Sequence, residues 1–187
     1  MTVRLVALMR GINVGRAKRL AMADLRALVE SLGYTDVRSL LNSGNVVFTA
    51  PGATQQEAAR RIEEALADRL GVSSKVTVLG AKELAAIMEG NPLAGIGRDP
   101  SRLLVAVVAG RSDLGRLEPL AERDWTPEAL TVGARAAYLW CPQGVLGGPL
   151  FEAVNRALGG AVTTRNWATM TKLLALAGPS SPQGACR

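Results

Sequence analysis

The chain has 187 residues, of which 48% are hydrophobic, and it carries a formal net charge of +6 without a single histidine. This length and apolar content fit one folded domain or two small ones, not a disordered chain. The missing histidine excludes Ser-His-Asp and Cys-His nucleophiles and the usual zinc and iron sites. Two cysteines, Cys141 and Cys186, are too few for a disulfide framework or a cysteine zinc site.

The N-terminal stretch MTVRLVALMRGINVG has the pattern of a strand and loop and not that of a signal peptide, and no run of about eighteen apolar residues occurs. We therefore expect a cytoplasmic protein that has no membrane partner, no metal and no cofactor. Basic residues exceed acidic ones in residues 1–26 and 153–187, whereas the middle of the chain is acidic. A basic charge can signal a polyanionic partner, and the alternative is a compositional habit, since 18 of the 22 basic residues are arginine.

The first half alternates strand and helix signals. Strands are expected at 3–9, 36–41, 45–50 and 74–79, and helices at 22–32 and 55–70. Thr54 and Glu57 have the spacing of a capping box, and Gly33 and Gly71 stand where helix C-terminal glycines would. The order β-α-β-β-α-β is that of a ferredoxin-like unit.

The second half repeats this order after a helix and a loop rich in glycine and proline. Strands are expected at 102–110, 129–132, 134–141 and 160–164, and helices at 113–122, 149–158 and 166–177. We predict an α+β fold of two ferredoxin-like (βαββαβ) units packed together, with an extra C-terminal helix. The subdomains would be 1–80 and 101–165, joined by 81–100 and followed by the helix 166–177 and a tail, 178–187.

The first motif is RGINVGRAKR. A glycine-rich turn after a buried strand can direct backbone N–H groups at an anion, and Arg10, Arg16, Lys18 and Arg19 would add charge. Its glycine spacing matches neither the dinucleotide fingerprint nor the P-loop. The alternative is a plain connection with solvated arginines.

The second motif is LNSGNVVF. Ser43 and Gly44 between two apolar strands are explained by a hairpin turn, because Gly44 supplies a positive φ. The functional alternative is that the turn presents Ser43 and Asn45 to a ligand as uncharged donors and acceptors.

The third motif is TTRNWATMTK. Thr163 or Thr164 is the expected N-cap of the last helix, which places Arg165 in the first turn, where the helix dipole disfavours a cation unless an anion lies nearby. The apolar face of this helix includes Trp167, so we expect Trp167 to be buried and Arg165 to stay partly exposed. Alternatively, Arg165 pairs with a buried carboxylate such as Asp24 or Glu30.

The three motifs in this order closely resemble the DUF1697 family, a group of small bacterial proteins whose biochemical function is not established. The resemblance implies an α+β fold of ferredoxin-like units and no particular activity. Similar proteins tend to carry a serine-lysine pair where this chain has Gly147-Gly148-Pro149. The resemblance implies a characteristic surface made of Arg10, Gly11, Asn13, Gly15, Ser43, Gly44, Asn45, Thr164, Arg165, Asn166 and Trp167.

We predict the binding of a phosphate-bearing or other anionic ligand, a nucleotide or RNA, in a cleft between the two subdomains. A standard RNA-recognition surface is disfavoured, because Phe48 is the only aromatic residue in the strands before residue 138. One alternative is an enzyme that acts on a small anionic substrate without histidine or metal, and another is a protein-interaction domain. The predicted ligand-binding residues are Arg10, Gly11, Asn13, Gly15, Lys18, Ser43, Gly44, Asn45, Thr164, Arg165 and Asn166.

Overall fold

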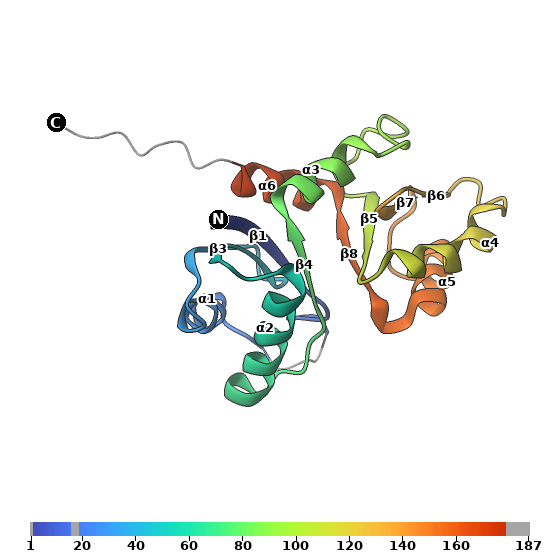
Figure 1. Cartoon of the computed structure of the whole chain (residues 1–187). Coiled ribbons are helices and arrows are strands. Elements are labelled where there is room, and N and C mark those ends of the chain that lie inside the picture. The colour runs from blue at the N-terminus through green and yellow to red at the C-terminus, as the bar shows by residue number, and fades with distance from the viewer. Residues whose placement is uncertain (1, 16–18, 179–187) are drawn as a thin grey trace. The chain divides into compact units, whose positions relative to one another are not determined.

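The structure is a computed structural model, and it describes residues 2–15 and 19–178. The chain forms two compact units (Figure 1). The first contains residues 1–84 together with 172–187, and the second contains residues 85–171. The boundaries fall inside the helices α3 (Ala81–Glu89) and α6 (Trp167–Ala177).

The first unit is built on a four-stranded antiparallel sheet in the order β2-β3-β1-β4. This order is the one that a split βαβ arrangement requires, because each helix connects two parallel strands that have a third strand between them. The ferredoxin-like prediction is confirmed. The elements are β1 (Thr2–Met9), α1 (Met22–Ser31), β2 (Thr35–Leu40), β3 (Asn45–Pro51), α2 (Gln55–Leu70) and β4 (Val76–Gly80).

The second unit repeats this topology with the strand order β6-β7-β5-β8, again fully antiparallel. Its first connection was predicted as one helix over 113–122, which is wrong. It is a 3-10 helix followed by a single α-turn, because Gly115 and Pro119 interrupt the run. The elements are β5 (Leu103–Val108), η1 (Arg111–Leu117), α4 (Glu118–Ala121), β6 (Ala129–Val132), β7 (Ala136–Trp140), α5 (Pro149–Leu158), η2 (Gly159–Ala161) and β8 (Val162–Asn166).

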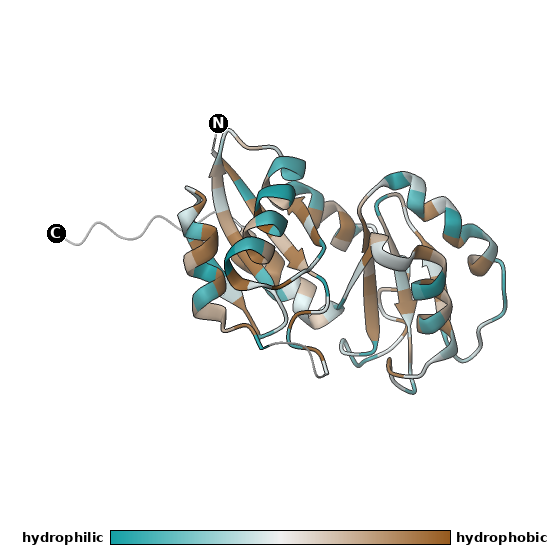
Figure 2. Cartoon of the chain, turned by 90° about the horizontal axis from the view of Figure 1, so that it is seen from below, coloured by the Kyte–Doolittle hydropathy of each residue, from teal (hydrophilic) through white to brown (hydrophobic). Residues whose placement is uncertain are grey.

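The core of the first unit forms where α1 and α2 cover one face of the sheet. Leu5, Ala7 and Met9 alternate along β1 and pack against apolar side chains of both helices. Val6 and Leu8, on the other face of β1, are also fully buried. Figure 2 shows the result, mostly hydrophobic strands and helices whose surfaces change from hydrophilic to hydrophobic around their axes.

Both ends of α2 form as the sequence predicts. The Thr54 side chain accepts from the backbone N–H of Glu57, and the Glu57 carboxylate accepts from the backbone N–H of Thr54. Gly71 closes the helix in the left-handed region, with φ 62°. The C-terminal end matters here because Ser73–Lys75, just after it, belong to the candidate site.

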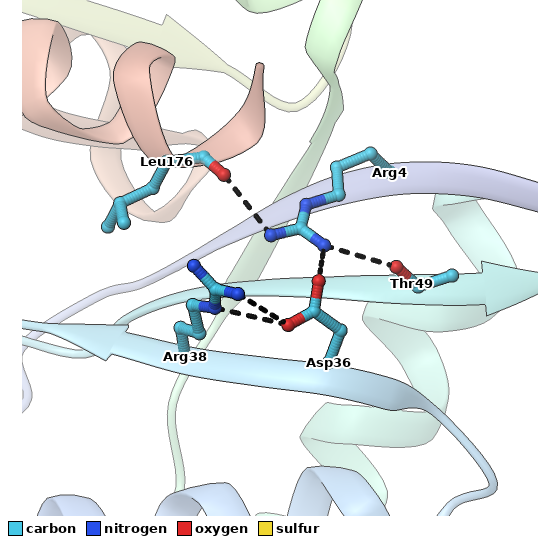
Figure 3. A network of polar contacts seen from close by, with 5 residues as sticks. All are labelled: Arg4, Asp36, Arg38, Thr49 and Leu176. Atoms are coloured by element: carbon cyan, nitrogen blue, oxygen red, sulfur yellow. Dashed lines mark hydrogen bonds and ion pairs between the residues drawn. The ribbon is translucent and has the colours of Figure 1, made fainter. Parts of the chain in front are cut away.

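Arg4 fastens the end of helix α6 to the sheet of the first unit (Figure 3). One Nη donates to the carboxylate of Asp36 and to Thr49 Oγ1, while the other Nη donates to the carbonyl of Leu176 at 3.2 Å. Arg38 also donates to Asp36, at 3.1 Å. The Arg4 guanidinium beside Asp36 lowers the pKa of that carboxyl below its usual value.

No helix among the described residues combines the length and the apolar character that crossing a membrane requires.

Candidate functional site

The loop that follows β1 lies between two other segments of the first unit. On one side, the Met9 N–H donates to the carbonyl of Gly44 at 2.8 Å, in the turn between β2 and β3. On the other, the Arg10 N–H donates to the carbonyl of Lys75 at 2.9 Å, and Ser74 Oγ donates to the Arg10 carbonyl at 2.8 Å. The loop after β1 is therefore in direct contact with the hairpin turn of the second motif, and the segment Ser73–Lys75 contacts the same loop at Arg10.

Gly44 allows this contact because it has no side chain. Its φ is +74°, and a Cβ there would lie 2.8 Å from the Cβ of Met9 and 2.9 Å from Cγ1 of Ile12. Any other residue would push the turn away from the loop. Gly44 of the SGN motif thus has two roles: its positive φ forms the turn, and its lack of a side chain allows the close packing.

Asn13 holds the loop in place with its side-chain amide. Its Nδ2 donates to the carbonyls of Leu20 at 2.9 Å and Asn42 at 2.8 Å, and its Oδ1 accepts from the Leu20 N–H at 2.7 Å. Asn13 itself adopts φ 56°, which asparagine tolerates better than most residues. These contacts tie the RGINVG loop to the hairpin turn and to the entry of α1.

Asn45 likewise holds the hairpin turn in place with its side-chain amide. Its side chain is fully buried, and Nδ2 donates to the Leu40 carbonyl at 3.0 Å and to Ser43 Oγ at 2.9 Å. These contacts show that Asn13 and Asn45, both predicted to contact a ligand, position the backbone of the site.

A cavity of about 550 Å³ opens beside this loop. Arg10, Gly11 and the segment Ser73–Lys75 supply one group of lining residues. Helix α2 supplies the other group, namely Glu63, Glu64 and Ala67. This volume lies within the range of small-molecule sites in proteins.

The cavity combines basic and acidic side chains. Lys75 Nζ lies 3.3 Å from Glu63 Oε2, and the other oxygen of Glu63 accepts from the Val76 N–H at 2.8 Å. Glu64 pairs with Arg60 one turn earlier on α2, at 2.7 Å. Glu63 thus bonds to the start of β4. Glu64 forms an exposed i,i+4 ion pair within α2, and ion pairs of this type contribute little to stability.

Sequence reasoning did not identify the segment Ser73–Lys75 or the α2 side chains as site residues. Ser73–Lys75 precede β4, and the backbone hydrogen bond between Arg10 and Lys75 places them beside the loop after β1. The α2 side chains line the same cavity. The adjacent polar run Ser73-Ser74-Lys75 was the available signal, because two hydroxyls and a lysine are groups that bind phosphate.

The third motif belongs to the second unit, and the prediction for it was wrong in its local structure. Residues Thr164–Asn166 continue strand β8, pairing with β5, and α6 begins only at Trp167. The β-branched run before Arg165 favours the extended strand. Asn166 instead caps the helix, because its Oδ1 accepts from the Thr169 N–H at 2.9 Å.

Arg165 therefore does not lie in the first turn of a helix, and the dipole argument does not apply to it. One Nη donates to the Thr164 carbonyl at 2.9 Å, and removal from water lowers the pKa of Arg165 to about 10, which leaves it charged at neutral pH. It is partly exposed, as predicted, but Trp167 is also only partly buried, contrary to prediction, because it stands at the strand–helix junction. Asp24 and Glu30 are exposed rather than buried.

The structure thus brings together Arg10, Gly11, Asn13, Ser43, Gly44 and Asn45, with Gly15 at the end of the same loop in the left-handed region. Lys18 and Arg16 lie outside the described residues. The common cleft with Thr164, Arg165 and Asn166 stays a prediction.

Helix α5 begins at the position where the family resemblance implies a serine-lysine pair in similar proteins. In this chain, a carboxylate contacts the first turn of the helix. Pro149 is the first helical residue, and Glu128 Oε2 accepts from the Leu150 N–H at 3.1 Å. An acid at a helix N-terminus satisfies a free N–H and complements the helix dipole. Glu128 thus provides a local partner for this end of the helix.

The sequence model of a family described as "Protein of unknown function (DUF1697)" matches residues 1–138, which include the first two motifs. The structure is similar to that of the conserved bacterial protein SP0830 from Streptococcus pneumoniae, with a TM-score of 0.74 and 23% sequence identity over 95% of this chain and 99% of that one. No curated protein matches the chain.

Proposed function

Since the chain belongs to the DUF1697 family, which has no assigned function, we propose a function from the site itself: the first unit binds a small phosphate-bearing anion in the cavity beside Arg10. The observation that carries this proposal is that Arg10, Ser73 and Lys75 all line a cavity of about 550 Å³. A guanidinium, an ammonium and a hydroxyl are the side-chain groups that most often bind phosphate oxygens.

The distribution of charge supports the same proposal. Residues 1–84 and 172–187 contain 14 basic and 8 acidic side chains, whereas residues 85–171 contain 8 of each. The whole net charge of +6 therefore belongs to the unit that contains the cavity. An excess of this size raises the local concentration of anions near the site.

The aromatic residues favour a small ligand over RNA. Phe48, on the central strand β3, is fully buried, and Tyr138 on β7 is 1% exposed, whereas Trp140 at the end of β7 is partly buried. RNA-binding sheets of this topology stack bases on exposed aromatic side chains, and these two are not accessible. The basic charge alone would give only weak, salt-sensitive association with RNA.

Isothermal titration calorimetry with inorganic phosphate at low ionic strength tests the proposal. We expect binding by the wild-type protein and a loss of at least about tenfold in affinity for Arg10→Ala, because a charge-assisted hydrogen bond contributes about 1.5–3 kcal/mol. Arg69→Ala is the matched control, since Arg69 is an exposed arginine of α2 that bonds Ser31 on α1. Equal binding by both variants, or binding of single-stranded RNA without binding of phosphate, would contradict the proposal.

A further inference from the structure

The cavity beside Arg10 has two chemically different groups of lining residues. The loop and the segment before β4 contribute Arg10, Ser73 and Lys75, whose side chains carry hydrogen-bond donors. Helix α2 contributes Glu63 and Glu64, which as carboxylates only accept hydrogen bonds. A ligand that fills the cavity must therefore be anionic at one end and rich in donors at the other.

The two carboxylates differ in how firmly they are held. Glu63 is 28% exposed and bonded to both the Val76 N–H and Lys75, so it is part of the framework. Glu64 is 56% exposed, and it pairs with Arg60, which is itself 63% exposed. An exposed i,i+4 pair is worth a fraction of a kcal/mol, so Glu64 is able to exchange this partner for a ligand hydroxyl.

The lining of the cavity also disfavours certain chemical groups in a ligand. A second phosphate or a carboxylate beside Glu64 would be repelled by that carboxylate, since its ion pair with Arg60 is exposed and weak. A purine or pyrimidine base would find no aromatic side chain among the described lining residues, of which Ala67 alone has an apolar side chain. Hydroxyl groups are not repelled by carboxylates and need no aromatic side chain.

We propose that the cavity binds a sugar phosphate, with the phosphate at Arg10 and Lys75 and the sugar hydroxyls donating to Glu64. This inference rests on the proposed function, since it assigns a class to the phosphate-bearing ligand. Glu64 is the specificity-determining residue, and Arg10 supplies the affinity common to all phosphates. Nucleotides bind through the same phosphate and sugar groups and gain nothing from their base.

Calorimetric titrations with inorganic phosphate, ribose 5-phosphate and adenosine monophosphate test the assignment. For the wild-type protein we expect ribose 5-phosphate to bind about tenfold more tightly than phosphate, because one hydrogen bond to a charged group is worth at least that factor. Adenosine monophosphate should bind no more tightly than ribose 5-phosphate. Glu64→Gln should remove the preference for ribose 5-phosphate and leave the affinity for phosphate unchanged or slightly higher.

Glu30→Gln is the matched control, because Glu30 is an exposed carboxylate on α1 outside the cavity lining. It should retain the preference of the wild-type protein. Phosphate binding without any gain from the sugar, a preference that survives Glu64→Gln, or tighter binding of the nucleotide would overturn the sugar-phosphate assignment and leave the proposed function standing. No binding of any of the three probes would overturn the proposed function together with the assignment.

Discussion

Gly44 lies against Met9 so closely that a Cβ on Gly44 would be 2.8 Å from the Met9 Cβ. This contact joins the hairpin turn to the loop that carries Arg10. Gly44→Ala should lower the free energy of unfolding by about 2–5 kcal/mol, from left-handed backbone strain and overpacking together. Urea denaturation measures the change.

Gly52→Ala separates the two causes of this loss. Gly52 has a similar φ, +71°, but nothing lies within 4 Å of the position of its Cβ. Its substitution should therefore cost only the backbone strain, about 1–2 kcal/mol. Equal losses for the two variants would show that Gly44 is not crowded by Met9 and Ile12.

Asn45 should contribute to stability and only indirectly to binding. Asn45→Ala removes the donor to the Leu40 carbonyl from a fully buried position, so we expect a loss of about 1–3 kcal/mol. Asn42→Ala, at an exposed position of the same turn, should change stability by less than about 0.5 kcal/mol. Thermal and urea denaturation of both variants would check this, and a neutral Asn45→Ala would refute the positioning role.

The ion pair of Arg4 and Asp36 should give stability a specific pH dependence. Because Arg4 lowers the pKa of Asp36 in the folded protein, the stabilisation is present above the unfolded pKa of about 4 and is lost as the pH falls through the folded pKa. At neutral pH, Asp36→Asn should cost about 1 kcal/mol, since the carboxylate is partly exposed. The difference from wild type should shrink below about pH 4.

Asp68→Asn is the control for this experiment, because Asp68 is an exposed acid on α2. Its effect on stability should be small and should not change in the same pH range. A difference between Asp36→Asn and wild type that is the same at neutral and acidic pH would argue against the ion pair.

Cys141 should be unreactive in the folded protein. It is fully buried, and burial, together with the nearby Glu128 carboxylate, raises the pKa of its thiol to about 12. In a Cys186→Ser variant, Cys141 is the only remaining thiol. It should resist alkylation by iodoacetamide at pH 8 until denaturant is added, as followed by mass spectrometry. Rapid modification of the native protein would contradict this.

The fold was predictable from the sequence because its signals are local. The capping box at Thr54, the glycine at Gly71 and the apolar run of β1 each define one element, and the order of elements then selects the ferredoxin-like topology. The connection after β5 was less predictable, because a 3-10 helix and an α-helix share much of the same pattern.

The candidate site was only partly predictable. Glycine and asparagine motifs indicated the loop after β1 and the hairpin turn, but not that Asn13 and Asn45 bond to the backbone. The roles of Ser73, Lys75 and Glu64 depend on pairing between strands and helices far apart in sequence, which no local pattern contains. The predicted start of the last helix, in the TTRNW motif, was wrong because strand pairing with β5 overrides the helix signal at Asn166.

The most direct test of the central claim is a titration of the ¹⁵N-labelled protein with inorganic phosphate, followed in ¹H–¹⁵N correlation spectra. We expect saturable shifts of the backbone amide signals of Gly11, Ser73 and Lys75, which line the cavity together with Arg10, and we expect these shifts to be lost in Arg10→Ala. Signals of Gly133 and Arg135, in the turn between β6 and β7, should stay in place and serve as an internal control. Shifts that are absent, that spread without saturation, or that persist unchanged in Arg10→Ala would contradict the claim that this cavity binds phosphate.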